Sequence, residues 1–355
     1  MIDFTYDTFT NNTSGDTMKK QFRSLFLTLS LFGCMLSVSG CASAAGSFPP
    51  PASQNSSENT LNILTIGTAD SGGTMYPVGS AIAEVISSHD SQIKINLSAS
   101  GGSFDNVEGI AGGQTDLGLV SGDVAYAAYT GTNDFKDHPV TELRAIGAVY
   151  SSISNWMAPA EKHVSFVHDL TGLRIAIGPE GSTTEYSARI ALDASGITPD
   201  NSTLINYGIG SGSENVANGQ LDAIHGFAGI PIGGLTKLAE SIPCRLLQYT
   251  PDELSRILDS NSFYYRAVIP SGTYPGQNNE VETFGIKCLL CVNESMDEDL
   301  VYTLTKILHE SVPQLTQSHP ALAVLNEDGY ICCDLPIPLH KGAKRYYTET
   351  GCLEP

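Results

Sequence analysis

The sequence contains one short pattern twice, in the same order and at nearly the same spacing. Ile66 and Gly67 open the turn TADSGGTMY, and a second Ile-Gly pair, 111 residues later, opens PEGSTTEY. The tetrapeptide GQTD, which starts at Gly113, precedes the apolar stretch LGLV, and GQLD precedes AIHGF 106 residues later. Each copy therefore reads as strand, Gly/Ser/Thr-rich turn and helix, followed later by helix, GQxD and strand. We expect two lobes of one design.

Strands alternate with helices along both copies, which is typical of an α/β fold with mostly parallel sheets covered on both faces. The expected strands of the first lobe are LNILTIGT, QIKINLSA, DLGLV and LRAIGAVY. Those of the second lobe are LRIAIG, STLINYG, LDAIHGF and CRLLQY. After residue 263, the stretches FYYRAVIPSGTYPGQ and VETFGIKCLLCV and a helix around 297–315 are expected to complete the first lobe.

These assignments predict that the chain crosses twice between the lobes. Lobe 1 comprises residues 61–152 and 264–355, and lobe 2 comprises residues 153–263. The two crossings, near 151–156 and 264–268, would form a hinge, as in proteins whose lobes close around a ligand. Trp156, the only Trp, lies at the first crossing.

The first sixty residues have the pattern of an export signal followed by a linker. From residue 18 the chain reads MKKQFRSLFLTLSLFGCMLSVSGC, in which a basic flank, a short apolar run and small residues describe a secretory signal. We interpret residues 18–40 as a lipoprotein signal peptide, Cys41 as the lipid-modified mature N-terminus and residues 41–60 as a tether. Residues 1–17 have no signal character and are expected to be a start-site artefact. The alternative, a membrane helix, needs a longer apolar run. The sequence thus predicts an extracytoplasmic protein with a lipid anchor in the membrane.

The net charge of −20 disfavours nucleic acid as a partner, because the protein surface would repel phosphates. It does not exclude an anionic small ligand, because a cleft has its own local field. The cysteines beyond residue 41 are compatible with disulfides or with free thiols, and their apolar neighbours argue against a metal site. They are Cys244, Cys288, Cys291, Cys332, Cys333 and Cys352. We expect no metal and no cofactor.

Gly-rich turns recur where expected strands end and helices begin. In an α/β sheet, ligands bind beyond the carboxyl ends of the strands, where helix N-termini present unpaired N–H groups to anions. Gly72 and Gly73 would let the backbone approach a ligand, and Thr74 offers a hydroxyl. Similar turns are SGGS at 100–103, SGD at 121–123 and GSTTE at 181–185. One such turn alone is usually an ordinary helix cap, whereas several from two lobes indicate a binding site without catalytic groups.

Motifs of common enzymes are missing from the sequence. There is no GxSxG nucleophile elbow, no GxxxxGK[ST] phosphate loop and no HExxH zinc pair. Asp116 and Asp222 end matched helix-to-strand turns, where Asp commonly accepts backbone N–H bonds, so we assign them no catalytic role. We therefore expect a binding protein and not an enzyme.

Several of these segments together resemble the TAXI-type solute receptors of TRAP transporters. They are GTADSGGTMYPVG, SGGSFDNVEGIAGGQTDLGLVSGDVAYAAYTG, GPEGSTTEYSARIALDASGI, GQLDAIHGFAGIP, IPSGTYPGQ and PIPLHKGAKRYYTETG. The resemblance covers about residues 61–351. It implies an α/β, two-lobed periplasmic-binding-protein-like fold of type II with a hinged interlobe cleft. It also implies a receptor that hands organic acids or acidic amino acids to TRAP transporter membrane subunits.

The resemblance implies ligand contacts in four of the turns. Met75 stands where the family often has an aromatic residue, and we include it among these contacts. The expected contact residues are Gly73, Thr74, Met75, Tyr76, Ser100, Gly102, Ser103, Ser121, Asp123, Tyr126, Gly181, Ser182, Thr183 and Thr184.

No Arg lies in a Gly-rich turn, and Arg174 and Arg189 are not placed to face a cleft. We therefore expect a small mono- or dicarboxylate that is held by helix N-termini and hydroxyl groups. A surface module that binds a ligand and reports to a signalling partner remains an alternative from the same sequence. An enzyme with unusual site residues is the third reading.

Overall fold

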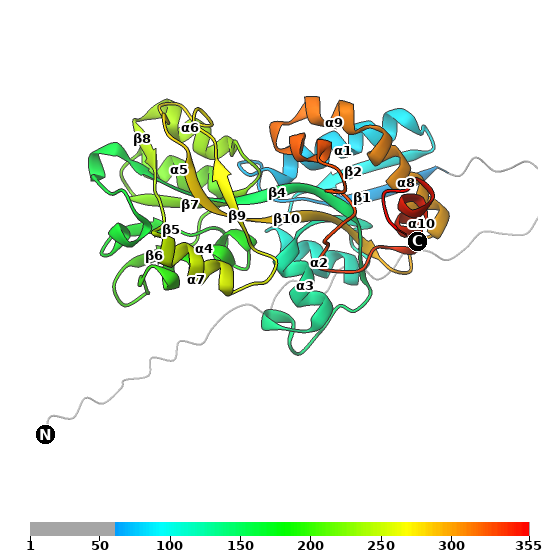
Figure 1. Cartoon of the computed structure of the whole chain (residues 1–355), viewed down its shortest axis with the longest axis horizontal. Helices are drawn as coiled ribbons and strands as arrows, with labels where there is room; N and C mark the ends of the chain where they lie inside the picture. The colour runs from blue at the N-terminus through cyan, green and yellow to red at the C-terminus, as the bar shows by residue number, and fades with distance from the viewer. Residues whose placement is uncertain (1–60, 355) are drawn as a thin grey trace, which may run out of the picture. The chain divides into compact units, whose positions relative to one another are not determined.

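A computed structural model of the chain describes residues 61–354 (Figure 1). The start-site artefact, the signal peptide, the lipid-modified Cys41 and the tether, all expected within residues 1–60, lie outside the described residues. No helix in residues 61–354 is both long and apolar enough to cross a bilayer.

The described residues form one mixed β-sheet with helices on its faces. The strands are β1 (Asn62–Gly67), β2 (Ile93–Ser98), β3 (Leu117–Ser121), β4 (Leu143–Pro159), β5 (Arg174–Ala176), β6 (Thr203–Ile205), β7 (Ala223–Ala228), β8 (Cys244–Leu246), β9 (Tyr265–Ile269) and β10 (Val281–Asn293). The α-helices are α1 (Met75–His89), α2 (Ser103–Ala111), α3 (Gly122–Thr130), α4 (Thr183–Ala194), α5 (Ile209–Ala217), α6 (Gly233–Ser241), α7 (Pro251–Asp259), α8 (Glu298–Glu310), α9 (Val312–Ser318) and α10 (Lys341–Glu349). Short 3₁₀ turns are η1 (Asn133–Phe135), η2 (Ala160–Lys162), η3 (Val167–Leu170) and η4 (Pro320–Asn326).

The strand order repeats the pattern that the sequence predicted. In the order β2-β1-β3-β10, the first three strands are parallel and β10 runs antiparallel to β3. In the order β6-β5-β7-β4, the first three strands are again parallel and β4 runs antiparallel to β7. Both halves therefore use their second, first and third strands in the same arrangement, which confirms the duplication.

Two aspartates at equivalent places hold the first strand of each half. Asp116 accepts a hydrogen bond from the Thr65 backbone N–H at 2.7 Å, and its own N–H donates to the Thr65 carbonyl. Asp222 does the same with Arg174, at 3.0 Å from the backbone N–H. The predicted structural role of both carboxylates is therefore confirmed. Each GQxD turn locks the start of the third strand to the first.

Two long strands connect the halves. β4 pairs with β10 along residues 143–153, and its last residues pair with β7 and β8. β10 pairs with β9 through residues 281–285 and with β3 through residues 288–292. Figure 1 shows both strands running from the group of α4 to α7 to the group of α1, α8 and α10. We propose that these two strands form the hinge, because they pair with strands of both halves.

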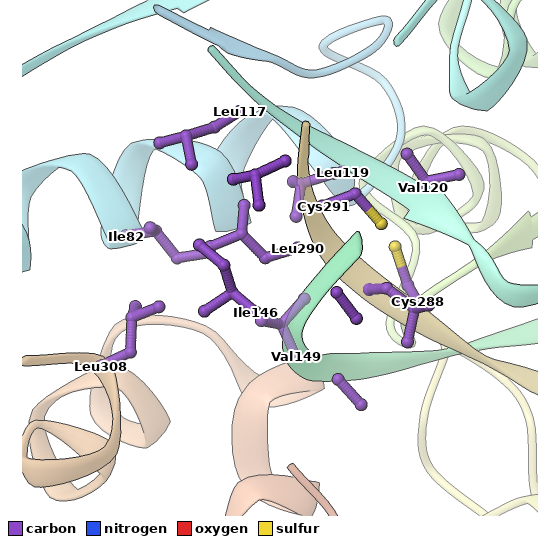
Figure 2. Packing of buried hydrophobic residues seen from close by; sticks show 14 of the residues in the cluster. Ile82, Leu117, Leu119, Val120, Ile146, Val149, Cys288, Leu290, Cys291 and Leu308 are labelled. Atoms are coloured by element: carbon purple, nitrogen blue, oxygen red, sulfur yellow. The ribbon is translucent and has the colours of Figure 1, made fainter. Parts of the chain in front are cut away.

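The buried hydrophobic side chains form one cluster in the first half of the sheet and two clusters in the second half. In the first, residues of β3, β4 and β10 pack against α1 and α8, as Figure 2 shows for Leu119, Ile146, Leu290, Ile82 and Leu308. In the other two, side chains from residues 264–286 pack with those of residues 153–263. We therefore keep the two lobes as a proposal and move the second crossing from 264–268 to about 286–288, within β10.

Cys288, Cys291 and Trp156 are buried in these cores. Cys288 and Cys291 point into the apolar cluster, and burial raises the pKa of Cys288 to about 12. Trp156 is buried in lobe 2, where its indole N–H donates to the Tyr249 hydroxyl at 2.7 Å. All six cysteines within residues 61–354 are free thiols in the structure. In the same range, no group of three or more His, Cys, Asp or Glu side chains is arranged to hold a metal ion.

The contacts of Asp222, which has more partners than Asp116, should make a measurable contribution to stability. The Asp222 carboxylate also binds the Arg174 guanidinium at 2.9 Å and the Lys162 ammonium at 2.6 Å, and these partners hold the pKa of Asp222 well below its usual range. Asp222→Asn should lower the free energy of unfolding by about 2 kcal/mol at pH 7, because hydrogen bonds to charged groups are lost. Urea denaturation followed by circular dichroism measures this loss.

The pH dependence gives the test its direction. A carboxylate with a lowered pKa in the folded state stabilises fully above its unfolded pKa of about 3.9, and the stabilisation is lost as pH falls further. The difference between wild type and Asp222→Asn should therefore shrink below about pH 4. Asp116→Asn, which removes a carboxylate with no cationic partner in residues 61–354, should cost less at pH 7. A difference that grows on acidification would contradict this role of Asp222.

Candidate functional site

A small cavity of about 50 Å³ lies between the two lobes. Its walls come from the ends of β1 and β7, from the turns before α1, α2 and α4, and from the start of α5. The lining residues are Ala69, Asp70, Gly73, Thr74, Met75, Gly101, Gly102, Ser103, Tyr150, Pro179, Ser182, Thr183, Thr184, Ile209, Phe227 and Ala228. Ligand pockets usually measure about 300–1,000 Å³, so only a very small group fits without movement of the lobes.

The structure gathers part of the expected contact set around this cavity. The residues in the lining are Gly73, Thr74, Met75, Gly102, Ser103, Ser182, Thr183 and Thr184. The expected residues outside the lining are Tyr76, Ser100, Ser121, Asp123, Tyr126 and Gly181. Whether the residues in the lining bind a ligand remains a prediction.

Helix N-termini dominate the electrostatics of the cavity. Thr74 and Gly102 are the N-cap residues of α1 and α2, and neither helix has a side-chain cap. The N–H groups of Met75 and Ser103, which begin these helices, have no acceptor among the described residues. α4 differs, because the Ser182 hydroxyl accepts a bond from its third N–H. The positive ends of α1 and α2 therefore face the cavity with unused donors.

Most hydroxyls in the lining are used within the protein. Thr74 donates to the carbonyl of Gly229 at 2.6 Å, and Ser182 donates to the carbonyl of Pro179 at 2.7 Å. The Thr183 hydroxyl donates to Ser103 at 2.8 Å, across the lobes. These three hydroxyl hydrogens are therefore engaged, which the sequence could not show.

Two hydroxyls retain a free hydrogen. Ser103 Oγ accepts from Thr183 and from the backbone N–H of Ser121 at 2.9 Å, but its own hydrogen has no acceptor among the described residues. Thr184 lines the cavity, and its hydroxyl has no hydrogen-bond partner in residues 61–354. Ser103 is completely buried, and a buried donor without an acceptor is costly. An acceptor in the cavity next to this hydroxyl would therefore be strongly favoured.

No Arg, Lys or His occurs among the residues that line the cavity. His225 lies behind the wall and contacts the carbonyl of Thr184 at 3.1 Å, and burial lowers the pKa of this imidazole to about 3, so it stays neutral. Arg174 is bound by Asp222 and Arg189 by Glu185. An anion in the cavity would therefore meet helix dipoles and neutral donors, and the Asp70 carboxylate is the one charged side chain of the lining.

On one side of the cavity, side chains join the two lobes. The Tyr264 hydroxyl donates to the Asp123 carboxylate at 3.0 Å, and burial raises the pKa of Asp123. The rings of Tyr126 and Phe263 lie 4.9 Å apart. Asp123 and Tyr126, both expected at the ligand, thus join α3 to lobe 2 instead of lining the cavity. Ser121 holds its place through the bond of its N–H to Ser103.

The remaining expected residues outside the lining shape its turns or face solvent. The Ser100 hydroxyl donates to the Thr68 carbonyl at 2.7 Å and accepts from the Gly102 N–H, which fixes the turn before α2. The Gly181 N–H donates to the Glu185 carboxylate at 2.7 Å within the turn before α4. Tyr76 is 39% exposed on the outer side of α1.

On the other side, backbone groups join the two lobes. The Gly72 carbonyl accepts a bond from the Gly234 N–H, at the start of α6, at 3.0 Å. A Cβ on Gly72 would lie 2.5 Å from the Gly210 nitrogen in α5. The Gly-rich turn before α1 thus lets the two lobes meet main chain to main chain.

A larger hollow of about 750 Å³, which we name the hinge groove, lies at the crossing strands. Ser151 lines it, whereas its neighbour Tyr150 lines the cavity, and successive side chains of a strand point to opposite faces. The hinge groove therefore lies behind β4. Its Lys287 ammonium already donates to the carbonyls of Tyr330 and Cys333, at 3.1 and 2.8 Å. Two of the three hydrogens of this ammonium are therefore engaged within the protein, and Glu327, Asp328 and Asp334 add negative charge to the hinge groove.

The sequence analysis missed part of the lining. Phe227 and Ala228 end the strand that follows GQLD, at the place where Ser121 ends the strand after GQTD, so the duplication itself was a usable signal. Asp70 stands inside the quoted turn, but its target on α5 cannot be read from local sequence. Tyr150 ends the expected strand LRAIGAVY, but the side of the strand that meets the cavity cannot be read from its sequence.

Comparisons with known proteins identify the family. The family model described as NMT1-like matches residues 66–351, and the chain belongs to the NMT1-like family. The resemblance to TAXI-type receptors of TRAP transporters is therefore wrong, and so is the TRAP membrane subunit as partner. The short Gly-rich motifs that suggested it occur at helix starts generally and do not distinguish families of this fold.

Solved structures share the architecture. A periplasmic transporter has a TM-score of 0.51 and 12% identity, with 74% of this chain and 87% of that chain covered. A protein from Bordetella bronchiseptica RB50 has a TM-score of 0.50 and 13% identity, with 82% and 99% covered. The alkanesulfonate-binding protein from Xanthomonas axonopodis pv. citri has a TM-score of 0.45 and 16% identity, with 83% and 81% covered. The predicted α/β periplasmic-binding-protein-like fold is confirmed.

The backbone contact between the lobes gives a test of lobe closure. Gly72→Ala should hold the lobes apart, because its Cβ would collide with main chain that cannot turn away, and overpacking costs about 1–3 kcal/mol. Small-angle X-ray scattering should show a larger radius of gyration than for wild type. Gly73→Ala is the matched control, since a Cβ there meets nothing closer than 3.5 Å. Equal radii for Gly72→Ala and Gly73→Ala would show that the contact does not limit closure.

Proposed function

We propose that this NMT1-like protein is an extracytoplasmic solute-binding receptor that captures a small carboxylate between its lobes and delivers it to a membrane import system. The observation that carries the proposal is the meeting of two uncapped helix N-termini, those of α1 and α2, at the interlobe cavity. Such N-termini attract anions through their free N–H groups and their dipoles.

The donors in the cavity suit a carboxylate. Met75 and Ser103 supply backbone N–H groups, and the hydroxyls of Ser103 and Thr184 supply free hydrogens. Hydrogen bonds to a charged group contribute about 1.5–3 kcal/mol each. Three or four of them support micromolar binding, about −8 kcal/mol, without an ion pair. We expect binding without turnover, because the one carboxylate of the lining, Asp70, is held by the N–H groups of Gly72 and Gly210.

A sugar needs aromatic platforms and planar polar side chains at its site. Tyr150 and Phe227 are the aromatic residues of the lining, and both are buried. The membrane anchor at Cys41 is part of the same proposal, because a receptor near its transporter captures solute where delivery occurs. The alternative that the sequence left open is a receptor that reports to a signalling partner. It would bind its ligand at the same site.

A thermal-shift screen with sodium acetate, pyruvate, succinamate, succinate, glutamine and glutamate, and with glucose and maltose, tests the ligand class. A ligand at about 100 times its dissociation constant stabilises by about 2.7 kcal/mol, which raises Tm by several degrees. We expect such a rise with at least one carboxylate and with neither sugar. Stabilisation by the sugars alone would overturn the proposal.

Affinities of two variants then locate the site. Thr184→Val keeps the shape of the side chain and removes a free hydroxyl, and should weaken the best carboxylate about tenfold or more in isothermal titration calorimetry. Arg174→Ala is the control, because its guanidinium is bound by Asp222 outside the lining, and should leave the affinity unchanged. The opposite pattern, with Arg174→Ala alone abolishing binding, would exclude helix N-termini as the main anion site.

A further inference from the structure

Asp70 places a carboxylate of one lobe on a helix of the other. It lies in the turn between β1 and α1, where its Oδ1 accepts the Gly72 N–H at 3.2 Å. Its Oδ2 accepts the N–H of Gly210, in the first turn of α5, at 3.3 Å. The N-cap of α5 is Gly208, which has no side chain to offer. Asp70 therefore caps a helix of lobe 2 from lobe 1, which is favourable for a carboxylate at a helix N-terminus.

The duplication shows what Asp70 replaces. α5 connects the second and third strands of lobe 2, as α2 connects the second and third strands of lobe 1. Both helices begin with a Gly N-cap and no side-chain cap. The turn before α4, which is equivalent to the turn of Asp70, offers Glu180, but this residue is exposed and has no partner among the described residues. The first turn of α2 contains Asp105, but this exposed carboxylate accepts the Gly101 N–H before the helix, at 2.7 Å, and not an N–H of α2. Of the two equivalent helix N-termini, that of α5 therefore has an N–H bound by a carboxylate, and that of α2 does not.

Asp70 also forms part of the cavity wall, next to Ile209 at the start of α5. A ligand carboxylate at α1 and α2 thus shares the cavity with a fixed carboxylate of the protein. No Lys or Arg in residues 61–354 forms an ion pair with Asp70. A second anionic group on the ligand would meet this negative charge at short range.

We propose that Asp70 is a specificity-determining residue that restricts the ligand to a single anionic group. The N-termini of α2 and α5 are equivalent anion positions, and Asp70 occupies the one at α5. One carboxylate of a dicarboxylate could bind at α2, but the other would meet the like charge of Asp70. Discrimination by an unfavourable charge is a usual way to reject a competitor of the same shape. This inference rests on the proposed function, because it assumes that a carboxylate binds at α1 and α2.

Pairs of probes that differ only in one charge test it directly. The pairs are malonamate and malonate, succinamate and succinate, and glutamine and glutamate, in which an amide replaces one carboxylate. Titration calorimetry with the wild-type protein should show tighter binding of the amide member, by about tenfold, in each pair that fits the cavity. Asp70→Asn should bring this ratio close to one, because the repelling charge is gone while the side-chain shape remains.

A charge on the same helix supplies the control. Glu214 is exposed on α5 and forms no ion pair among the described residues, so Glu214→Gln removes one negative charge near the site without touching the helix N-terminus. This variant should keep the wild-type preference for the amides. Asp70→Ser, which retains a capping oxygen without charge, replaces Asp70→Asn if the latter does not fold.

The outcomes separate the two claims. A wild-type protein that binds both members of a pair equally, or an Asp70→Asn variant that keeps the tenfold preference, overturns the role of Asp70 and leaves the carboxylate receptor intact. Absence of binding by all six probes and by the other carboxylates of the screen overturns the proposed function itself.

Discussion

The first N–H groups of an α-helix have no acceptor within the helix, and the protein meets this requirement differently at each helix that starts between its lobes. α4 is capped by its own Ser182, α5 by Asp70 of the opposite lobe, and α6 by the Gly72 carbonyl of the opposite lobe. α1 and α2 have no such partner and begin at the cavity. The contacts that close the lobes and the proposed contacts to the ligand are therefore both made at helix N-termini between the lobes.

The sheet makes this arrangement possible. β4 and β10 run through both lobes, so the two groups of parallel strands turn their carboxyl ends toward a common space. Helices that follow those strands begin in that space, and their dipoles add there. Gly72 allows the lobes to approach main chain to main chain, which brings the N-termini of α5 and α6 against the turn before α1. Closure and anion binding depend on the same few backbone groups.

Much of the fold could be predicted from sequence because it is periodic and repeated. Alternating strands and helices, two GQxD turns and two Gly-rich turns predicted an α/β protein of two similar halves, and both aspartate locks follow the prediction. The family could not be chosen this way, because short Gly-rich turns report a helix start and not a lineage, and the NMT1-like match corrected it.

The site was harder to predict than the fold, for a physical reason. A sequence shows which hydroxyls stand in a turn, but their hydrogen-bond partners come from distant segments, as with Thr74 and Gly229, 155 residues apart. Asp123 likewise has the chemistry of a ligand contact, yet its partner is Tyr264. Only the folded chain shows that Ser103 and Thr184 keep free donors and that Asp70 reaches α5.

The central claim is that a carboxylate binds at the N-termini of α1 and α2, and backbone NMR tests it most directly. The carboxylate that stabilises the protein best in the screen is titrated into protein labelled with ²H and ¹⁵N, and amide shifts are followed. The largest changes are expected at the amides of Met75, Tyr76, Ser103 and Phe104, because their N–H groups gain a charged acceptor. Changes confined to the hinge groove, around Lys287 and Tyr330, with none in these four amides, would contradict the account.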